Sequence, residues 1–126
     1  MSLKKIENDF AKFSVEDGVI HFVYKQGEEL DLQGAIQVVA DRLKAQGNTS
    51  FPIICDIRGL KSVNKEARDY LAKEGSSKVS AVALVVGSPA RKVMSNFYLA
   101  VNKPDVPTRL FISEEDALTY LHSLEG

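Results

Sequence analysis

The sequence lacks several features that mark whole classes of protein. Its 126 residues contain one cysteine, Cys55, and no tryptophan. A single cysteine excludes a disulfide within the chain and, with no secretory signal in view, favours the reducing cytoplasm. No apolar run approaches the roughly 20 residues that cross a bilayer, so we expect no integral membrane segment. The formal net charge of -1 gives no general attraction to nucleic acid.

Motifs of catalysis and cofactor binding are also missing. His21 and His122 lie far apart in the sequence, and neither is at metal-ligand spacing from Cys55, so we expect no metal site. No glycine-rich loop of the dinucleotide or nucleoside-triphosphate type occurs. Cys55 lies in an isoleucine-rich segment, where a buried and unreactive thiol is the expected role. These absences predict a protein that is not an enzyme and needs no cofactor.

What is present is an alternation of apolar strands and amphipathic helices. The most informative segment is 79–89, an almost unbroken valine-rich run closed by Gly87, Ser88 and Pro89. A strand this apolar is covered on both faces, as in a sheet that carries helices. Ser88 is a predicted helix N-cap and Pro89 a predicted first helical residue.

The rest of the chain fits the same scheme and predicts one α/β domain over residues 1–126. The order is β-β-α-β-α-β-α-β-α, a mixed sheet of about five strands that begins with a hairpin and has at least three parallel strands. The predicted elements are strands 10–15 and 19–24, a helix after Asp31 to about 46, strand 51–57, a helix after Asn64 to 74, a strand from Val79, helix 89–102, strand 109–112 and a helix after Ser113.

Several segments resemble the STAS domain, the fold of bacterial anti-sigma factor antagonists. Residues 54–60 are similar to the family's strand that ends in an apolar-Asp-apolar pattern before its regulatory loop. Residues 83–89, 102–104, 107–111 and 114–118 resemble a subgroup of small STAS-like bacterial proteins of unknown function, related in fold to CRAL-TRIO lipid-binding domains. The resemblance implies a βα superhelix with an N-terminal hairpin and four helices.

One motif of the resembled family is absent. Members with a phosphorylation switch carry Asp-Ser-Ser/Thr-Gly at the start of the helix after the middle strand. Residues 64–67 here are Asn-Lys-Glu-Ala, which puts the phosphorylatable position near Lys65. The resemblance therefore implies the scaffold without the usual phosphorylatable serine, and Ser62 in the preceding loop is the alternative phosphorylation site.

Two loops that follow predicted strands carry candidate binding residues, one of them for a small anionic ligand or an acidic partner. Ser88 begins a helix at the carboxyl end of a buried strand, where free N–H groups attract anions, and Arg91 and Lys92 follow it. Asp56 and Arg58 end the preceding strand, at the edge where α/β sheets place their ligands. The alternative is structural: Ser88 caps the helix, the basic side chains are solvated, and Asp56 anchors its loop by accepting from backbone N–H groups.

The helix predicted over 89–102 has more apolar surface than one packed face requires. Its apolar arc spans roughly 160°, against about 100° for a single buried stripe. We expect the side of Val93, Phe97 and Ala100 to pack on the sheet. The surplus predicts a neighbouring helix, a homodimer surface or the wall of an apolar ligand groove. Its members are Met94, Tyr98 and Val101.

Two hypotheses of function follow. The first is a non-enzymatic interaction or regulatory module that associates with a protein partner or with itself. The alternative is a binder of a small apolar or anionic ligand, such as a lipid, by analogy with the CRAL-TRIO fold. A flat apolar patch that meets its own symmetry mate would favour the first hypothesis. A pocket lined by Met94 and Tyr98 and large enough for an acyl chain would favour the second.

Overall fold

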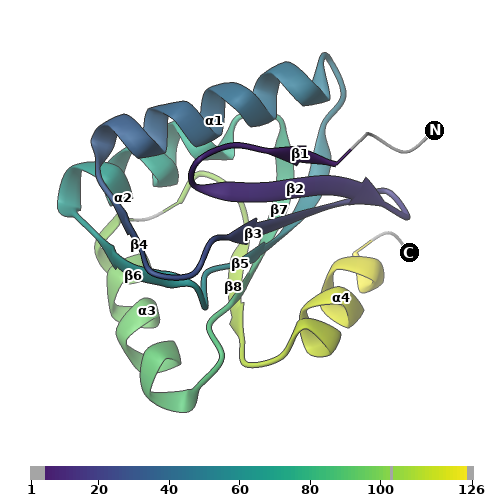
Figure 1. The fold of residues 1–126 in the computed structure, drawn as a ribbon. Coiled ribbons are helices and arrows are strands. Elements are labelled where there is room, and N and C mark those ends of the chain that lie inside the picture. The colour runs from purple at the N-terminus through teal and green to yellow at the C-terminus, as the bar shows by residue number, and fades with distance from the viewer. Residues whose placement is uncertain (1–4, 103, 125–126) are drawn as a thin grey trace.

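The computed structural model describes residues 5–102 and 104–124, with the backbone alone at 97, 98, 101 and 102. Over these residues it is a mixed α/β fold with four α-helices, a six-stranded sheet in the order β1-β2-β3-β5-β7-β8 and a small sheet of β4 and β6 (Figure 1). The elements are β1 (Ile6–Glu7), β2 (Ala11–Glu16), β3 (Val19–Tyr24), β4 (Glu28–Leu30), α1 (Leu32–Gln46), β5 (Phe51–Asp56), β6 (Leu60–Val63), α2 (Lys65–Lys73), the 3-10 turn η1 (Glu74–Ser76), β7 (Val79–Val85), α3 (Pro89–Asn102), β8 (Thr108–Phe111) and α4 (Glu114–Ser123).

Capping side chains account for where the helices begin. Each of the four predicted N-caps accepts a hydrogen bond from the backbone N–H three residues further on, which satisfies a donor that the helix itself leaves unpaired. The hairpin of β2 and β3 turns at two residues with positive φ, Asp17 and Gly18, as a tight two-residue turn requires. The caps are Asp31, Asn64, Ser88 and Ser113.

Three short strands were not predicted: β1, β4 and β6. The sequence indicates that the chain leaves the sheet at Arg58 and Gly59, but it enters β6 at Leu60 and pairs in parallel with β4. Glycine permits this path, because a Cβ at Gly59 would lie 2.6 Å from the carbonyl oxygen of Tyr24. Ser62, expected in a loop, is an exposed residue of β6. These strands are short and polar, so their sequences carry little periodic signal.

The order of the parallel strands decides which face each helix covers. β3, β5, β7 and β8 are parallel neighbours in the same order as in the chain. Because crossovers between parallel strands are right-handed, the three connecting helices α1, α2 and α3 lie on one face. The opposite face is left to α4, and Figure 1 shows α4 there.

The face under α4 is closely packed. Side chains of β3, β5 and β7 meet two residues of α4 in one cluster, and all of its members are buried. Alanines at 81, 83 and 117 allow the helix to approach the strands closely, because their side chains add little bulk. The cluster consists of Val19, Ile54, Ala81, Ala83, Val85, Ala117 and Leu121.

The other face has more helices than it can pack flat. Six strands about 4.8 Å apart span roughly 24 Å, whereas each packed helix occupies about 10 Å, so the face has room for about two helices. α1 and α2 cover the sheet from β2 to β5, where their buried residues join one core with Phe13, Phe22 and Ile53. α3 lies at the end of this layer, beside β6 in Figure 1.

The sequence prediction for the sheet-facing side of α3 is wrong. Val93 was expected to pack on the sheet, but its side chain is 69% exposed, and Ala100 is exposed as well. Arg91 explains the different orientation, because its guanidinium donates hydrogen bonds to carbonyl oxygens of the loop between β5 and β6. That anchor turns Ala90 and Leu99 toward the sheet side. The expectation for Phe97 concerns a side chain outside the described residues.

Candidate functional site

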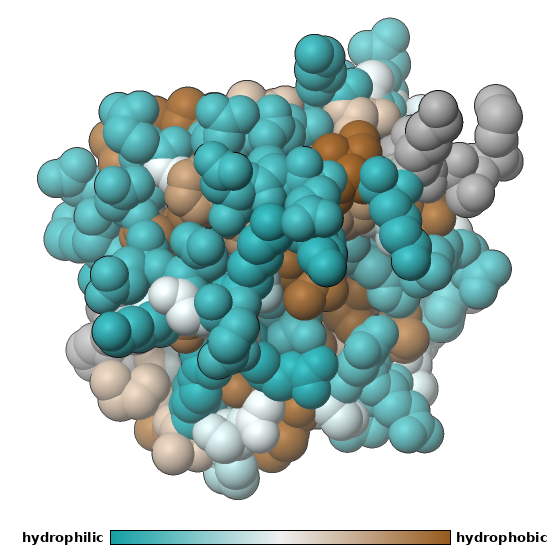
Figure 2. Space-filling model, in the orientation of Figure 1, coloured by the Kyte–Doolittle hydropathy of each residue, from teal (hydrophilic) through white to brown (hydrophobic). Residues whose placement is uncertain are grey.

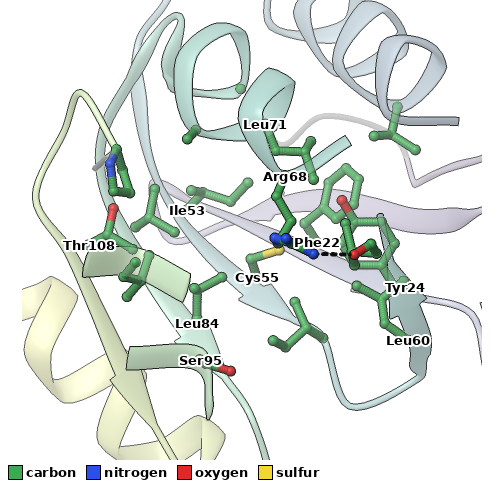
Figure 3. A pocket seen from close by; sticks show the side chains of 18 of the residues that line it. Phe22, Tyr24, Ile53, Cys55, Leu60, Arg68, Leu71, Leu84, Ser95 and Thr108 are labelled. Atoms are coloured by element: carbon green, nitrogen blue, oxygen red, sulfur yellow. Dashed lines mark hydrogen bonds between the residues drawn. The ribbon is translucent and has the colours of Figure 1, made fainter. Parts of the chain in front are cut away.

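A pocket of about 620 Å³ lies between α3, α2 and the sheet (Figure 3). Its floor comes from neighbouring strands, with Phe22 on β3, Cys55 on β5, Leu84 on β7 and Thr108 on β8. These residues belong to the side of each strand that faces away from α4, because successive side chains alternate between faces. The volume falls within the range of about 300–1,000 Å³ typical of small-molecule sites.

The walls of the pocket are mostly apolar and come from helices and from the small sheet. β6 contributes Leu60 and Val63, and α2 contributes Leu71 and Ala72. α3 closes the remaining side. Three of its pocket residues lie four, five and nine positions after Ala90, which is the spacing of one helical face, and Arg91 lies beside them. The residues of α3 at the pocket are Ala90, Arg91, Met94, Ser95 and Leu99.

Cys55 and Tyr24 are the two ionisable side chains on the floor, and both are neutral at neutral pH. Burial raises the pKa of the Cys55 thiol to about 12, with the charge of Asp56 adding to the effect. Burial also raises the pKa of the Tyr24 phenol well above its ordinary value. A thiol protonated at neutral pH is a poor nucleophile, which agrees with the unreactive role expected for Cys55.

All of the fully charged side chains that line the pocket are cations. Among the described residues, the lining contains Arg42, Lys61, Arg68 and Arg91 but no aspartate or glutamate. Lys61 is at the surface and faces Glu29, with 3.8 Å between Nζ and Oε1. Arg42 is buried, and Arg68 and Arg91 are hydrogen-bonded to backbone carbonyl oxygens. These three fixed cations give the pocket a positive electrostatic potential.

Arg42 is a buried charge, with only 4% of its surface exposed. Its guanidinium donates to the side-chain oxygen of Gln46 and to the carbonyl oxygens of Gly75 and Ser77. All three acceptors are neutral. Burial lowers the pKa of Arg42 from its ordinary value, because these groups only partly replace water around the charge.

Arg68 extends from α2 into the pocket and points toward Cys55 and Phe22 (Figure 3). Its Nη1 donates a hydrogen bond to the carbonyl oxygen of Val63, 2.8 Å away. This bond fixes the guanidinium against the junction of β6 and α2. The cation is therefore held at the apolar centre of the pocket and not at its mouth.

Sequence reasoning missed Arg42 and Arg68, although each leaves a trace in the helical pattern. Arg42 is seven residues after Ala35 and lies on the same buried face of α1, while the apolar residues Ile36 and Ala40 are exposed. Arg68 is three residues before Leu71 on α2, on the face that lines the pocket. An arginine at a core position of an amphipathic helix is the signal that could have found both.

The structure places Asp56 and Arg58 at the end of β5, paired with each other. The Asp56 carboxylate accepts from the Arg58 backbone N–H at 3.0 Å, and Arg58 Nη2 lies 2.6 Å from Oδ2. Burial opposes ionisation of Asp56, but the hydrogen bonds from Arg58 outweigh it and hold the pKa of the carboxyl below its usual value. This is the loop-anchoring role that was the alternative to ligand binding.

Ser88, Arg91 and Lys92 lie at the start of α3, above the β5–β6 loop. Ser88 Oγ accepts from the Arg91 N–H at 3.2 Å, as the predicted N-cap. The Arg91 side chain donates to the carbonyl oxygens of Arg58, Ile57 and Leu60 at 3.1–3.3 Å. Arg91 thus fastens α3 to the rim of the pocket, while Lys92 is half-buried and does not line the pocket.

Of the three surplus apolar residues of α3, Met94 lines the pocket and is also 55% exposed. The side chains of Tyr98 and Val101 lie outside the described residues. In the view of Figure 2, hydrophilic side chains cover most of the surface, and apolar atoms show at its lower edge, where Figure 1 places α3. Met94 therefore belongs both to the pocket and to an exposed apolar helix surface.

A polar hollow on the opposite face of the sheet contains both histidines of the chain. His21 Nε2 lies 3.6 Å from Glu16, and His21 Nδ1 lies 3.7 Å from Glu114. Within residues 5–102 and 104–124, no three histidine, cysteine, aspartate or glutamate side chains are grouped so that they could hold a metal ion. The described helices are also too short or too polar to cross a bilayer.

Comparison with protein families identifies the chain. The model of a domain of unknown function, DUF7793, matches residues 13–125, which is nearly the whole fold. The chain belongs to the DUF7793 family. A search of curated proteins finds no match.

Two solved structures are similar to this member of the family. One is an uncharacterised DUF3478-family protein with a SpoIIAA-like fold from Shewanella loihica PV-4, with 12% identity, a TM-score of 0.59 and coverage of 94% of this chain and 91% of the other. The other is a protein of unknown function from Arthrobacter sp. FB24, with 28% identity, a TM-score of 0.34 and coverage of 86% and 95%.

The Shewanella protein shows the fold alone, given its low identity. A SpoIIAA-like fold is the STAS fold, so the resemblance drawn from residues 54–60 and 83–89 is confirmed at the level of architecture. The sheet has six strands where about five were predicted, and the four predicted helices are present among the described residues.

Proposed function

We propose that this protein is a non-enzymatic binding module that holds a small apolar molecule in the pocket beneath α3. The observation that carries the proposal is the pocket itself. Its volume of about 620 Å³ is close to the 640 Å³ of the polar hollow at His21, so the lining and not the size distinguishes it. The pocket beneath α3 is walled mainly by apolar side chains of strands and helices, as small-molecule sites are. A ligand with an apolar body would restore contacts that the uncovered strand side chains lack.

The residues around the space support this proposal. Small side chains face it from both helices, Ala72 on α2 and Ala90 and Ser95 on α3. Larger apolar residues at these positions would fill the gap and bind the helices more tightly to the sheet. Of the two hypotheses drawn from the sequence, the lipid-like binder therefore receives more support than the interaction module.

An interaction module is the second candidate, supported by a different observation. Val93 and Met94 are adjacent, 69% and 55% exposed, on the helix that covers the pocket. Exposed neighbouring apolar side chains favour contact with a protein partner or a second copy of the chain. Ligand binding and association would then share α3.

A matched pair of tryptophan variants tests the pocket. Ser95→Trp places a large side chain in the pocket, whereas the neighbouring Asn96 is exposed and absent from its lining. We expect Ser95→Trp to reduce binding of the neutral dye Nile red at least tenfold and Asn96→Trp to leave it unchanged. Because the natural chain has no tryptophan, the emission of each variant also reports whether the new ring is buried.

Native mass spectrometry of protein purified without detergent complements the dye. We expect an additional mass that disappears on denaturation and is absent from Ser95→Trp. The same spectrum gives the number of subunits, which tests the second candidate. A chain that carries no added mass and fails to bind the dye would contradict ligand binding, and a purely monomeric spectrum would contradict self-association.

A further inference from the structure

We infer that the ligand is a singly charged anionic amphiphile of the long-chain carboxylic acid class, with its carboxylate on Arg68 and its chain along the apolar floor. This inference rests on the proposed function, because it concerns the occupant of the same pocket. Three features of the described residues support it: the sign of the lining charges, the neutrality of the floor and the position of Arg68.

The lining charges are positive without exception. The pocket contains Arg42, Lys61, Arg68 and Arg91 and no carboxylate side chain among the described residues. Asp56, the acid next to the floor residue Cys55, turns to Arg58 at the end of β5. A purely apolar or cationic ligand would gain nothing from this field, whereas an anion is attracted by every charge in the lining.

The floor adds no negative charge at neutral pH. Cys55 and Tyr24 line the pocket, and burial keeps both the thiol and the phenol protonated. An apolar environment strengthens the attraction between the cationic lining and an anion, because it screens charges less than water does. An anionic head group gains from that attraction, and an alcohol of the same length does not.

Arg68 is the cation placed to receive the head group. It projects from α2 into the centre of the pocket (Figure 3), held by its hydrogen bond to the Val63 carbonyl oxygen. A guanidinium binds a carboxylate in a planar geometry through two parallel N–H donors. From this point Phe22, Ile53 and Leu84 provide an apolar floor for a chain.

The remaining cations favour one negative charge over two. They lie away from Arg68: Arg42 is held at the carbonyl oxygen of Gly75, Arg91 is at the rim on the β5–β6 loop, and Lys61 is at the surface. A phosphate monoester carries close to two charges at neutral pH. Its second charge would enter an apolar space with no second cation beside it, which costs free energy.

Four ligands of equal chain length test the inference on the native protein: dodecanoic acid, dodecanol, dodecylamine and dodecyl phosphate. Each displaces Nile red below its micelle-forming concentration. We expect the acid to bind at least tenfold more tightly than the alcohol, about 1.4 kcal/mol, and the amine to bind most weakly. We expect dodecyl phosphate to bind less tightly than the acid.

A matched pair of arginine variants locates the head group. Arg68→Met retains an apolar side chain of similar length and removes the charge. We expect it to lose most of the preference for the acid over the alcohol, with affinity for the alcohol retained. The control is Arg109→Met, since Arg109 is an exposed residue of β8 that does not line the pocket, and it should keep the preference for the acid.

The outcomes separate this inference from the proposed function. Equal affinities of the native protein for the acid and the alcohol would overturn the anionic ligand and leave apolar binding in place. Tighter binding of dodecyl phosphate than of the acid would overturn the carboxylate class. Failure of all four ligands and of the dye would overturn both proposals. If Arg68→Met does not fold, the ligand series on the native protein still decides the charge of the ligand.

Discussion

The two faces of the central sheet are built from the same strands and packed in opposite ways. On one face, Ala81, Ala83 and Val85 of β7 meet α4 in a fully buried cluster. On the other, the alternating residues Val82 and Leu84 of the same strand are only partly buried and border about 620 Å³ of space. The backbone and register are shared, so the difference comes from what covers each face.

The comparison shows how topology creates a binding site. Right-handed crossovers place three helices over one face, where the six strands offer room for about two helices packed flat. The third helix is fastened at its first turn by Arg91 and leaves the floor beneath it uncovered. The opposite face carries the single helix α4 and packs closely beneath it, while the polar hollow at His21 lies at the side of that helix.

Leucine truncations on the two faces give the largest expected effect. Leu121→Ala removes a fully buried side chain from the α4 cluster and should lower the free energy of unfolding by about 2–5 kcal/mol. Leu84→Ala should cost about 1 kcal/mol or less, because its side chain already borders open space. Equilibrium denaturation in urea measures both, and equal losses would show that the pocket is filled or collapsed in solution.

A change at the start of α3 should have a smaller effect that is confined to the pocket face. Arg91→Met removes hydrogen bonds from a charged donor to three loop carbonyls, and each such bond contributes about 1.5 kcal/mol or less when half-exposed. We expect amide hydrogen exchange in α3 to accelerate roughly tenfold while α4 is unchanged. Lys92→Met, which changes the neighbouring cation, is the control, and equal acceleration in both variants would contradict the anchoring role.

The smallest effect concerns acid stability at the end of β5. Arg58 lowers the pKa of Asp56 in the folded state, so the pair stabilises the fold above the unfolded pKa of about 3.9 and is lost as the pH falls through the folded pKa. Arg58 is about half exposed, so we expect less than about 1 kcal/mol. In Asp56→Asn, the melting temperature should fall less steeply as the pH is lowered, measured by thermal melting between pH 5 and the acid transition. An unchanged dependence on pH would mean that the pair does not persist in solution.

The sequence predicted the helices and the long strands because their signals are local. N-caps such as Asp31 and Asn64 and the apolar run of β7 depend only on neighbouring residues. The short strands β4 and β6 were missed because they are polar and pair with residues 32–33 positions away in the sequence. Their parallel pairing is a property of the folded chain.

The candidate site was predictable only in part, for the same reason. The excess of apolar residues on helix 89–102 pointed to a groove, and Met94 does line the pocket. Which side of α3 faces the sheet could not be predicted, because Arg91 sets that orientation through carbonyls more than 30 residues away. Arg68 and Cys55 come together from different elements, with no spacing in the sequence to link them.

The position of α4 at the end of the fold has a consequence for synthesis on the ribosome. The strand faces carrying Val19, Ile54 and Val85 leave the exit tunnel before the helix that shields them. Until residues 114–123 emerge, the nascent sheet exposes an apolar surface on that side. Chaperone contact with this face during translation should therefore persist until α4 is made, and then end as the α4 cluster closes.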